Sequence, residues 1–171
     1  MGITMGFART RLRTAIPLAT LIATTLVIGM QARSASAAAA SGDEQVHKLL
    51  MIALDRIGRA LCEGKNRCAP TTAEESANPP ITIAEARLVI HRGALSGAAE
   101  RCALDWQGRN FQPMMTYWRR TLKKNERQMA LIGILHGLVQ GIGASNAKLA
   151  CTDEMRKNVD RQLTFQAPTR S

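Results

Sequence analysis

Acidic residues are missing from the beginning of this 171-residue chain, and the first one is Asp43. Arginines precede an apolar run from Ala15 to Met30, and the small residues Ala35-Ser36-Ala37 follow it. A basic start, an apolar run and a small-x-small site are the three parts of a secretory signal peptide. We therefore expect residues 1–37 to be removed on export and residues 38–171 to form a single helical domain.

Other sorting signals are also lacking. No Arg-Arg pair precedes the apolar run, and no cysteine stands near the expected cut, which excludes the twin-arginine route and a lipid anchor. The run of 16 residues is shorter than the roughly 20 that a membrane-spanning helix needs. We expect the general secretory route, a bacterial periplasmic location and no transmembrane span after cleavage, with an uncleaved anchor as the alternative.

Alternation of apolar and polar residues, which is typical of a half-buried strand, is absent from residues 38–171. Apolar residues recur instead at every third or fourth position, as in amphipathic helices. The sequence predicts an all-α bundle of four to five helices, with a loop over 64–81 and a polar tail over 166–171. The expected helices cover residues 43–63, 82–104, 111–122, 125–142 and 152–165.

Two helix starts have local signals. Thr82 and Glu85 have the spacing of a capping box, in which each side chain bonds to the other's backbone N–H. Pro113 is expected in the first turn of the third helix, where a missing N–H costs nothing.

The cysteines are Cys62, Cys68, Cys102 and Cys151, and no two of them form a Cys-x-x-Cys motif. This spacing argues against a zinc site and excludes a c-type haem, whereas disulfides are usual in exported proteins. Bonded cysteines must lie at the same end of a bundle whose helices are about 30 Å long. Since antiparallel neighbours would make the second and fourth helices parallel, we predict the pairs Cys62–Cys68 and Cys102–Cys151.

Glycines one turn apart occur in two of the expected helices: Gly93 and Gly97, and Gly133, Gly137 and Gly141. Each costs roughly 1 kcal/mol relative to alanine inside a helix, so a compensating benefit is expected. We favour close packing of the second helix against the glycine side of the fourth, which would be central and buried. The alternative is a ligand groove on that side, with His136 and Gln140 as its polar contacts.

No catalytic motif is found. Glu44-x-x-His47 is one half of a di-iron motif without its second copy, and Ser145-x-x-Lys148 lacks the partner motifs of penicillin-binding proteins. We therefore expect a protein that is not an enzyme, with no cofactor and no metal.

The remaining feature is the segment 105–127, in which the stretch from Arg109 to Arg127 carries six basic residues and one acid, Glu126. It also holds four of the five aromatic residues expected in the mature chain, and aromatic residues beside arginine are typical of interaction hot spots. The candidate partner-binding residues are Trp106, Arg109, Tyr117, Trp118, Arg119, Arg120, Lys123 and Lys124. The alternative is that this helix packs its apolar side on the core and leaves its charges in water.

These patterns predict a protein that binds an envelope protein or an anionic surface, such as phospholipid or glycan, through the segment 105–127. Nucleic acid is not an expected partner, because export separates the chain from it. A small-ligand or metal carrier that uses His136 and Gln140 is the alternative function. The sequence leaves the oligomeric state open.

Overall fold

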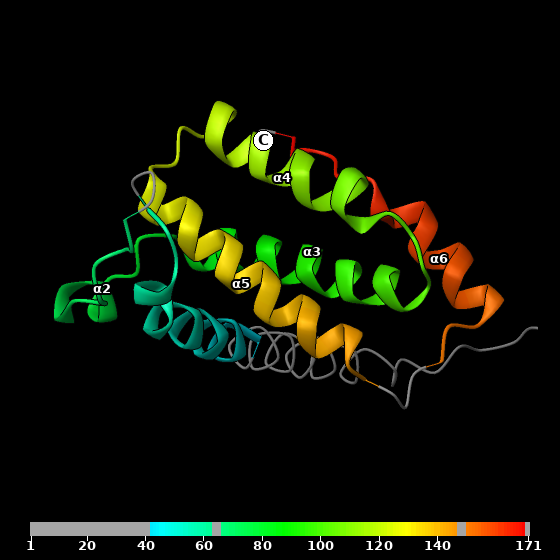
Figure 1. Cartoon of the computed structure of the whole chain (residues 1–171), viewed down its shortest axis with the longest axis horizontal. Helices are drawn as coiled ribbons and strands as arrows, with labels where there is room; N and C mark the ends of the chain where they lie inside the picture. Colours follow the sequence, from blue (N-terminus) through cyan, green and yellow to red (C-terminus); the bar gives the residue numbers. More distant parts are fainter. Residues whose placement is uncertain (1–41, 63–65, 147–149, 170–171) are drawn as a thin grey trace, which may run out of the picture. The chain divides into compact units, whose positions relative to one another are not determined.

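The structure is a computed structural model that describes residues 42–62, 66–146 and 150–169. These ranges contain six α-helices, besides short 3-10 and π-helical turns, and no β-strand (Figure 1). A single isolated bridge pairs Leu61 with Arg67. The expected signal peptide lies outside the described residues. Residues 42–55 are helical, followed by η1 (Ile57–Arg59), α2 (Ala73–Ala77), α3 (Ile83–Arg101), η2 (Gln107–Phe111), α4 (Gln112–Thr116), η3 (Tyr117–Thr121), α5 (Glu126–Ala144) and α6 (Asp153–Leu163).

The all-helical prediction is confirmed, as is the capping box that begins α3. Thr82 Oγ1 accepts from the N–H of Glu85, and the Glu85 carboxylate accepts from the N–H of Thr82. The same arrangement of Asn125 and Gln128 begins α5. Both long helices therefore start at positions that their own sequence specifies.

The first helix ends at residue 55, eight residues before its predicted end at 63. After it, Cys68 donates its N–H to the Ala60 carbonyl (2.9 Å) and Cys62 donates to the Asn66 carbonyl (3.0 Å). These bonds take backbone groups that a longer helix would have used, so the disulfide-closed loop replaces the last two predicted turns.

The predicted loop over 64–81 contains a short helix, α2, which makes six helices rather than four to five. Thr72 and Glu75 form a capping box at its start. Its five residues fall below the length at which periodicity is visible, but the Thr-x-x-Glu spacing was a usable signal.

The third long helical stretch begins at Gln107, not at Phe111, so Pro113 lies in its interior. Proline has no N–H, and the carbonyl of Arg109, four residues earlier, therefore lacks its helical donor. The Phe165 N–H donates to that carbonyl instead (2.8 Å). A π-helical turn, η2, precedes the proline and adapts the backbone to it.

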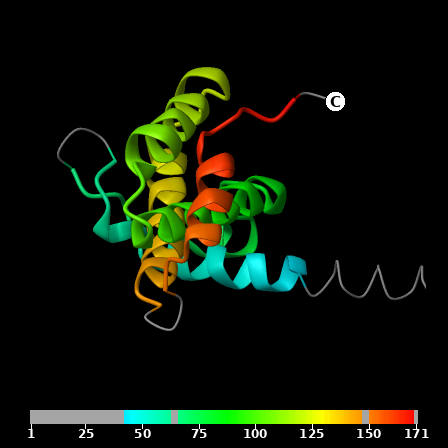
Figure 2. The same cartoon turned by 90° about the vertical axis from the view of Figure 1, so that its right-hand side faces the viewer.

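The main core lies where the first helix, α3, α5 and the stretch 107–121 meet. Trp118, Met114 and Leu135 are almost completely buried there. A smaller cluster, built on Ala99, Val159 and Leu163, attaches α6 to α3, and Figure 2 shows these two helices side by side. Helix α6 ends at Leu163, two residues before its predicted end at 165, and Phe165 beyond it packs against the main core.

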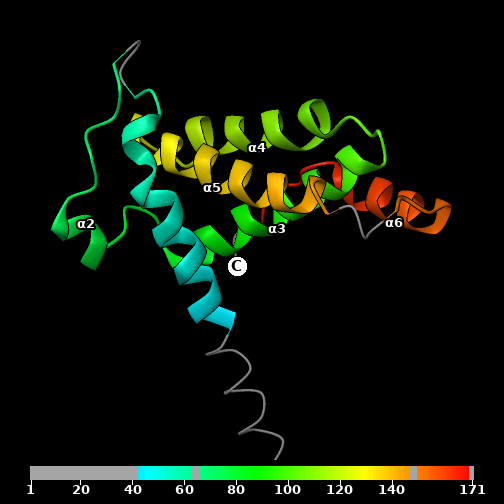
Figure 3. The same ribbon diagram turned by 60° about the horizontal axis from the view of Figure 1, so that its bottom comes forward.

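Helices α3 and α5 run parallel and in close contact (Figure 3). A Cβ added to Gly93 would lie 2.8 Å from the His136 carbonyl oxygen, and one added to Gly97 would lie 2.5 Å from that of Gln140. Close packing at the α3 glycines is therefore confirmed. The α5 side of the prediction is wrong: a Cβ at Gly137 or Gly141 would meet nothing within 4 Å.

The α5 glycine that faces α3 is Gly143, whose Cα is 2.9 Å from the Cβ position of Gly97. Glycines one turn apart therefore mark the helix contact on α3 alone. On α5, the contact is made by backbone atoms and the Val139 side chain.

Both predicted disulfides are present, with Cα–Cα distances of 4.9 Å for Cys62–Cys68 and 5.3 Å for Cys102–Cys151. The reasoning from helix direction is also confirmed, since parallel α3 and α5 bring the residues after their C-terminal ends to the same pole.

Alanine at Gly97 is expected to destabilise the protein by about 2 kcal/mol or more, because its Cβ would press against backbone atoms of α5. Alanine at Gly137, an exposed position in open space, is expected to stabilise it by up to about 1 kcal/mol. Urea unfolding of the two variants measures both. Equal effects of the two substitutions would contradict the close packing of α3 on α5.

Removal of the Cys102–Cys151 disulfide is expected to lower the free energy of unfolding more than removal of Cys62–Cys68. The first bond joins residues 49 apart in sequence, whereas the second joins residues 6 apart. Loop-closure entropy gives about 4 kcal/mol for the first and about 2 kcal/mol for the second. Paired Cys→Ala variants, unfolded in urea, test the order. A greater loss for the short loop would show that this disulfide stabilises through native contacts rather than through closure.

Candidate binding surface

Four of the six basic residues in the segment 105–127 have carboxylate partners. Arg109 pairs with Asp160 (2.5 Å), Arg119 with Glu126 (2.7 Å), and Lys124 with Glu85 (2.6 Å). Arg127 forms a two-bonded pair with Glu75 in α2 and also donates to the Ala69 and Pro70 carbonyls. Most of the charge in this segment therefore links helices of the fold together.

The pairs differ in burial. Lys124 and Glu85 have side chains that are 14% and 21% exposed, whereas Arg119 and Glu126 are about half exposed, where an ion pair contributes little. The hydrogen bonds from Arg127 lower the pKa of Glu75, and the same pair raises the pKa of Arg127. Arg127 thus fastens α2 and its loop to the start of α5.

Arg120 and Lys123 are the exceptions. Both are exposed, and neither has a carboxylate within reach among residues 42–62, 66–146 and 150–169. Lys123 has a φ of 54°, the left-handed conformation that turns the chain from η3 into α5. These two cations define what we call the basic turn, residues 120–123.

The aromatic candidates are mostly part of the core. Trp118 is 1% exposed, and its indole N–H has no hydrogen-bond partner in the described part of the chain. Tyr117 is half-buried between Trp118 and Phe165. Trp106 is half-buried and stacks on His136 at 6.0 Å between ring centroids. The structure therefore does not bring the aromatic and basic candidates together on one exposed face.

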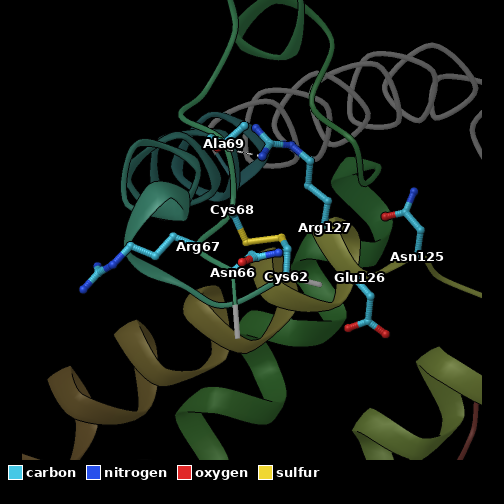
Figure 4. Close-up of a pocket in the computed structure, with 8 residues that line it drawn as sticks. All are labelled: Cys62, Asn66, Arg67, Cys68, Ala69, Asn125, Glu126 and Arg127. Carbon is cyan, nitrogen blue, oxygen red and sulfur yellow. Dashed lines mark hydrogen bonds between the residues drawn. A yellow bond between two sulfur atoms is a disulfide. The ribbon is translucent and has the colours of Figure 1, made fainter. Parts of the chain in front are cut away.

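A hollow of about 720 Å³ opens beside the start of α5 (Figure 4). Figure 4 shows the Cys62–Cys68 disulfide among the residues that line it, with Arg127 extending toward Ala69 and Arg67 pointing away from it. The Arg67 side chain is exposed and has no ion pair with the residues that the structure describes. The hollow and the basic turn are adjacent, because Asn125, two residues after Lys123, lines the hollow together with Glu126.

The two residues of the alternative ligand site, His136 and Gln140, have different surroundings. His136 is 1% exposed, and its Nε2 lies 3.0 Å from Ser96 Oγ. Gln140 donates to the Glu100 carboxylate on the surface. Neither side chain lines the hollow beside the start of α5 or the three other well-formed hollows considered among the described residues.

His136 belongs to a buried polar network whose other members, Arg92, Ser96 and Asn110, were not predicted from the sequence. Asn110 Nδ2 donates to Ser96 Oγ and to the Arg92 carbonyl, both at 2.8 Å, and Arg92 Nε donates to Asn110 Oδ1 (2.5 Å). Ser96 and Asn110 are fully buried. Ser96, at a buried position beside Gly97, was the signal available, because a polar side chain on a packed helix face needs a partner.

No group of three histidine, cysteine or acidic side chains among the described residues is arranged to hold a metal ion. None of the helices in this part of the chain combines the length and apolar character needed to cross a membrane. Comparisons with protein families, with curated proteins and with solved structures find no significant match. The functional interpretation therefore depends on the surface described above.

The pH dependence of stability should report on the buried network. Burial, and then the nearby charge of Arg92, lower the pKa of His136 from 6.5 to about 4. The unfolded chain thus binds a proton between these values that the folded protein does not. The contribution of this pKa shift to the free energy of unfolding is complete above pH 6.5 and is lost as the pH falls toward 4. The loss is about 2 kcal/mol between pH 7 and pH 5.

Urea unfolding at several pH values measures this loss. His136→Gln should remove most of it, whereas His47→Gln, at an exposed position, should leave it unchanged. An unaltered pH dependence in His136→Gln would show that other groups cause it.

Proposed function

We propose that this chain is an exported, non-enzymatic protein that binds an acidic face of another envelope protein through the basic turn and the adjoining hollow. The observation that carries the proposal is the unpaired state of Arg120 and Lys123, in a segment where the other four cations have carboxylate partners. Cations that the fold does not use remain available for a partner.

The shape of this surface favours a protein partner over a flat membrane. The hollow of about 720 Å³ beside the basic turn is concave, and Asn66 and the exposed Arg67 lie at its lining. A protruding acidic side chain can enter such a hollow, whereas a bilayer would contact only its rim. The two disulfides are compatible with export.

The fold also indicates which candidates should be left out of the binding site. Trp118 is in the core, and Lys124 and Arg127 join elements of the fold, so replacing them would change stability together with binding. The test must therefore use Arg120 and Lys123, which are both exposed.

The variant Arg120→Glu/Lys123→Glu should lose its partner while keeping its fold. A photo-reactive residue at Asn66, in the lining of the hollow, captures the partner in the envelope. The parent protein should give a discrete protein adduct, and the double variant should give less than about a tenth of it, since each reversal removes a favourable contact and adds a repulsive one. Circular dichroism and urea unfolding establish that the variant is folded.

Lys48→Glu/Lys157→Glu is the matched control, because it changes the net charge by the same amount at exposed positions away from the basic turn. It should retain the adduct. Equal loss of the adduct in both double variants would show that binding depends on overall charge and not on the basic turn. Binding to anionic vesicles that depends on Arg120 and Lys123, without any adduct, would assign the surface to lipid and overturn the protein partner.

A further inference from the structure

The side chain of Arg92 is a buried cation without a carboxylate. It is 7% exposed, and none of the ion pairs among the described residues includes it. Its partners are neutral: Asn110 Oδ1 and, at the end of α6, the carbonyl oxygens of Gln162 (3.1 Å) and Leu163. The burial of an arginine with only neutral partners calls for a physical reason, because the charge loses its hydration.

These partners compensate the charge only in part. The carbonyls belong to the C-terminal end of α6, which carries a partial negative charge, and the Phe165 ring lies 5.5 Å from the guanidinium carbon. A guanidinium has five N–H donors, and three of them have partners in the described part of the chain. Two N–H groups of Arg92 therefore have no hydrogen-bond partner in the described part of the chain, and most of its positive charge is not compensated.

Arg92 is also part of the lining of a hollow of about 280 Å³ between α3 and the end of α6. The other lining residues are His91, Arg161, Gln162, Thr164 and Gln166. None of them is acidic, and all of their side chains can donate hydrogen bonds. Arg161 is exposed, donates a hydrogen bond to Asn158 (3.3 Å) and forms no ion pair among the described residues, so its charge is not neutralised either.

We propose that this hollow is a binding site for a phosphate-type oxyanion, either inorganic phosphate or a phosphate monoester. The anion would lie between Arg92 and Arg161 and accept hydrogen bonds from the N–H groups that the fold leaves unpaired. A buried guanidinium binds such an anion more strongly than a surface arginine does, because water screens the interaction less. The site lies on α3 and α6, apart from the basic turn, and does not depend on the proposed protein partner.

Phosphate fits the lining better than a carboxylate does. Donors come from two separate segments, residues 91–92 of α3 and residues 161–166 at the end of α6, so they approach the hollow from more than one side. A tetrahedral dianion presents acceptor oxygens in several directions, whereas a carboxylate presents two oxygens in one plane. The second negative charge also matches the second arginine.

Titration of the ¹⁵N-labelled mature protein with inorganic phosphate, at constant ionic strength, tests the proposal. The Arg92 Nε–H signal and the backbone amides of residues 91–92 and 161–166 should shift and saturate together. Arg161→Gln should weaken phosphate binding about tenfold or more, which corresponds to the loss of one charge-assisted hydrogen bond. Arg56→Gln is the matched control, because it removes the same charge from an exposed arginine that belongs to neither proposed site and should leave the affinity unchanged.

Glycerol phosphate and acetate distinguish the ligand classes. Saturation with both phosphate and glycerol phosphate indicates a site open to monoesters, and saturation with phosphate alone indicates the free ion. Acetate binding as tight as phosphate binding would overturn the assignment to phosphate. The site itself would be overturned by shifts that do not saturate, or by equal affinities of the parent protein and Arg161→Gln.

Discussion

The structure depends on one buried set of hydrogen bonds, in which Asn110 joins Arg92 to Ser96 and Ser96 contacts His136. These four residues come from α3, η2 and α5, and Arg92 extends the set to the end of α6. Each buried polar group costs free energy unless its partners are in place. The network therefore favours the one arrangement of these helices in which all its members are bonded, whereas apolar contacts alone would tolerate several.

Close packing of α3 on α5 makes this network possible. The missing side chains of Gly93 and Gly97 let the backbone carbonyls of His136 and Gln140 approach α3, and this approach places the His136 ring beside Ser96. The same parallel arrangement brings Cys102 and Cys151 within bonding distance. Backbone proximity, the polar network and the disulfide are thus consequences of a single helix pairing, and a change at Gly97 should disturb all three.

The sequence was sufficient for features that depend on neighbouring residues or on the general geometry of helices. Thr82 with Glu85 marked the start of α3, and helix direction was enough to pair the cysteines. It was insufficient where a distant residue decides. Pro113 lies inside its helix because the Phe165 N–H, 56 positions after Arg109, takes the carbonyl that the proline leaves unpaired. Likewise, Glu75 and Glu85 became partners of Arg127 and Lys124 only in the folded chain, so the basic segment looked less neutralised than it is.

The contrast between two arginines shows how the fold separates structural charge from charge that is available to a ligand. Arg127 is bonded to Glu75, so its charge is cancelled where it stands, and the pair simply fastens α2 to α5. Arg92 is buried more deeply, but its partners are an amide and two carbonyls, which hold the guanidinium in place without cancelling its charge. A carboxylate in the place of those carbonyls would have fixed α6 equally well. Because the fold uses neutral acceptors instead, the positive charge at the hollow persists, and an anion that enters it meets a cation that is already oriented.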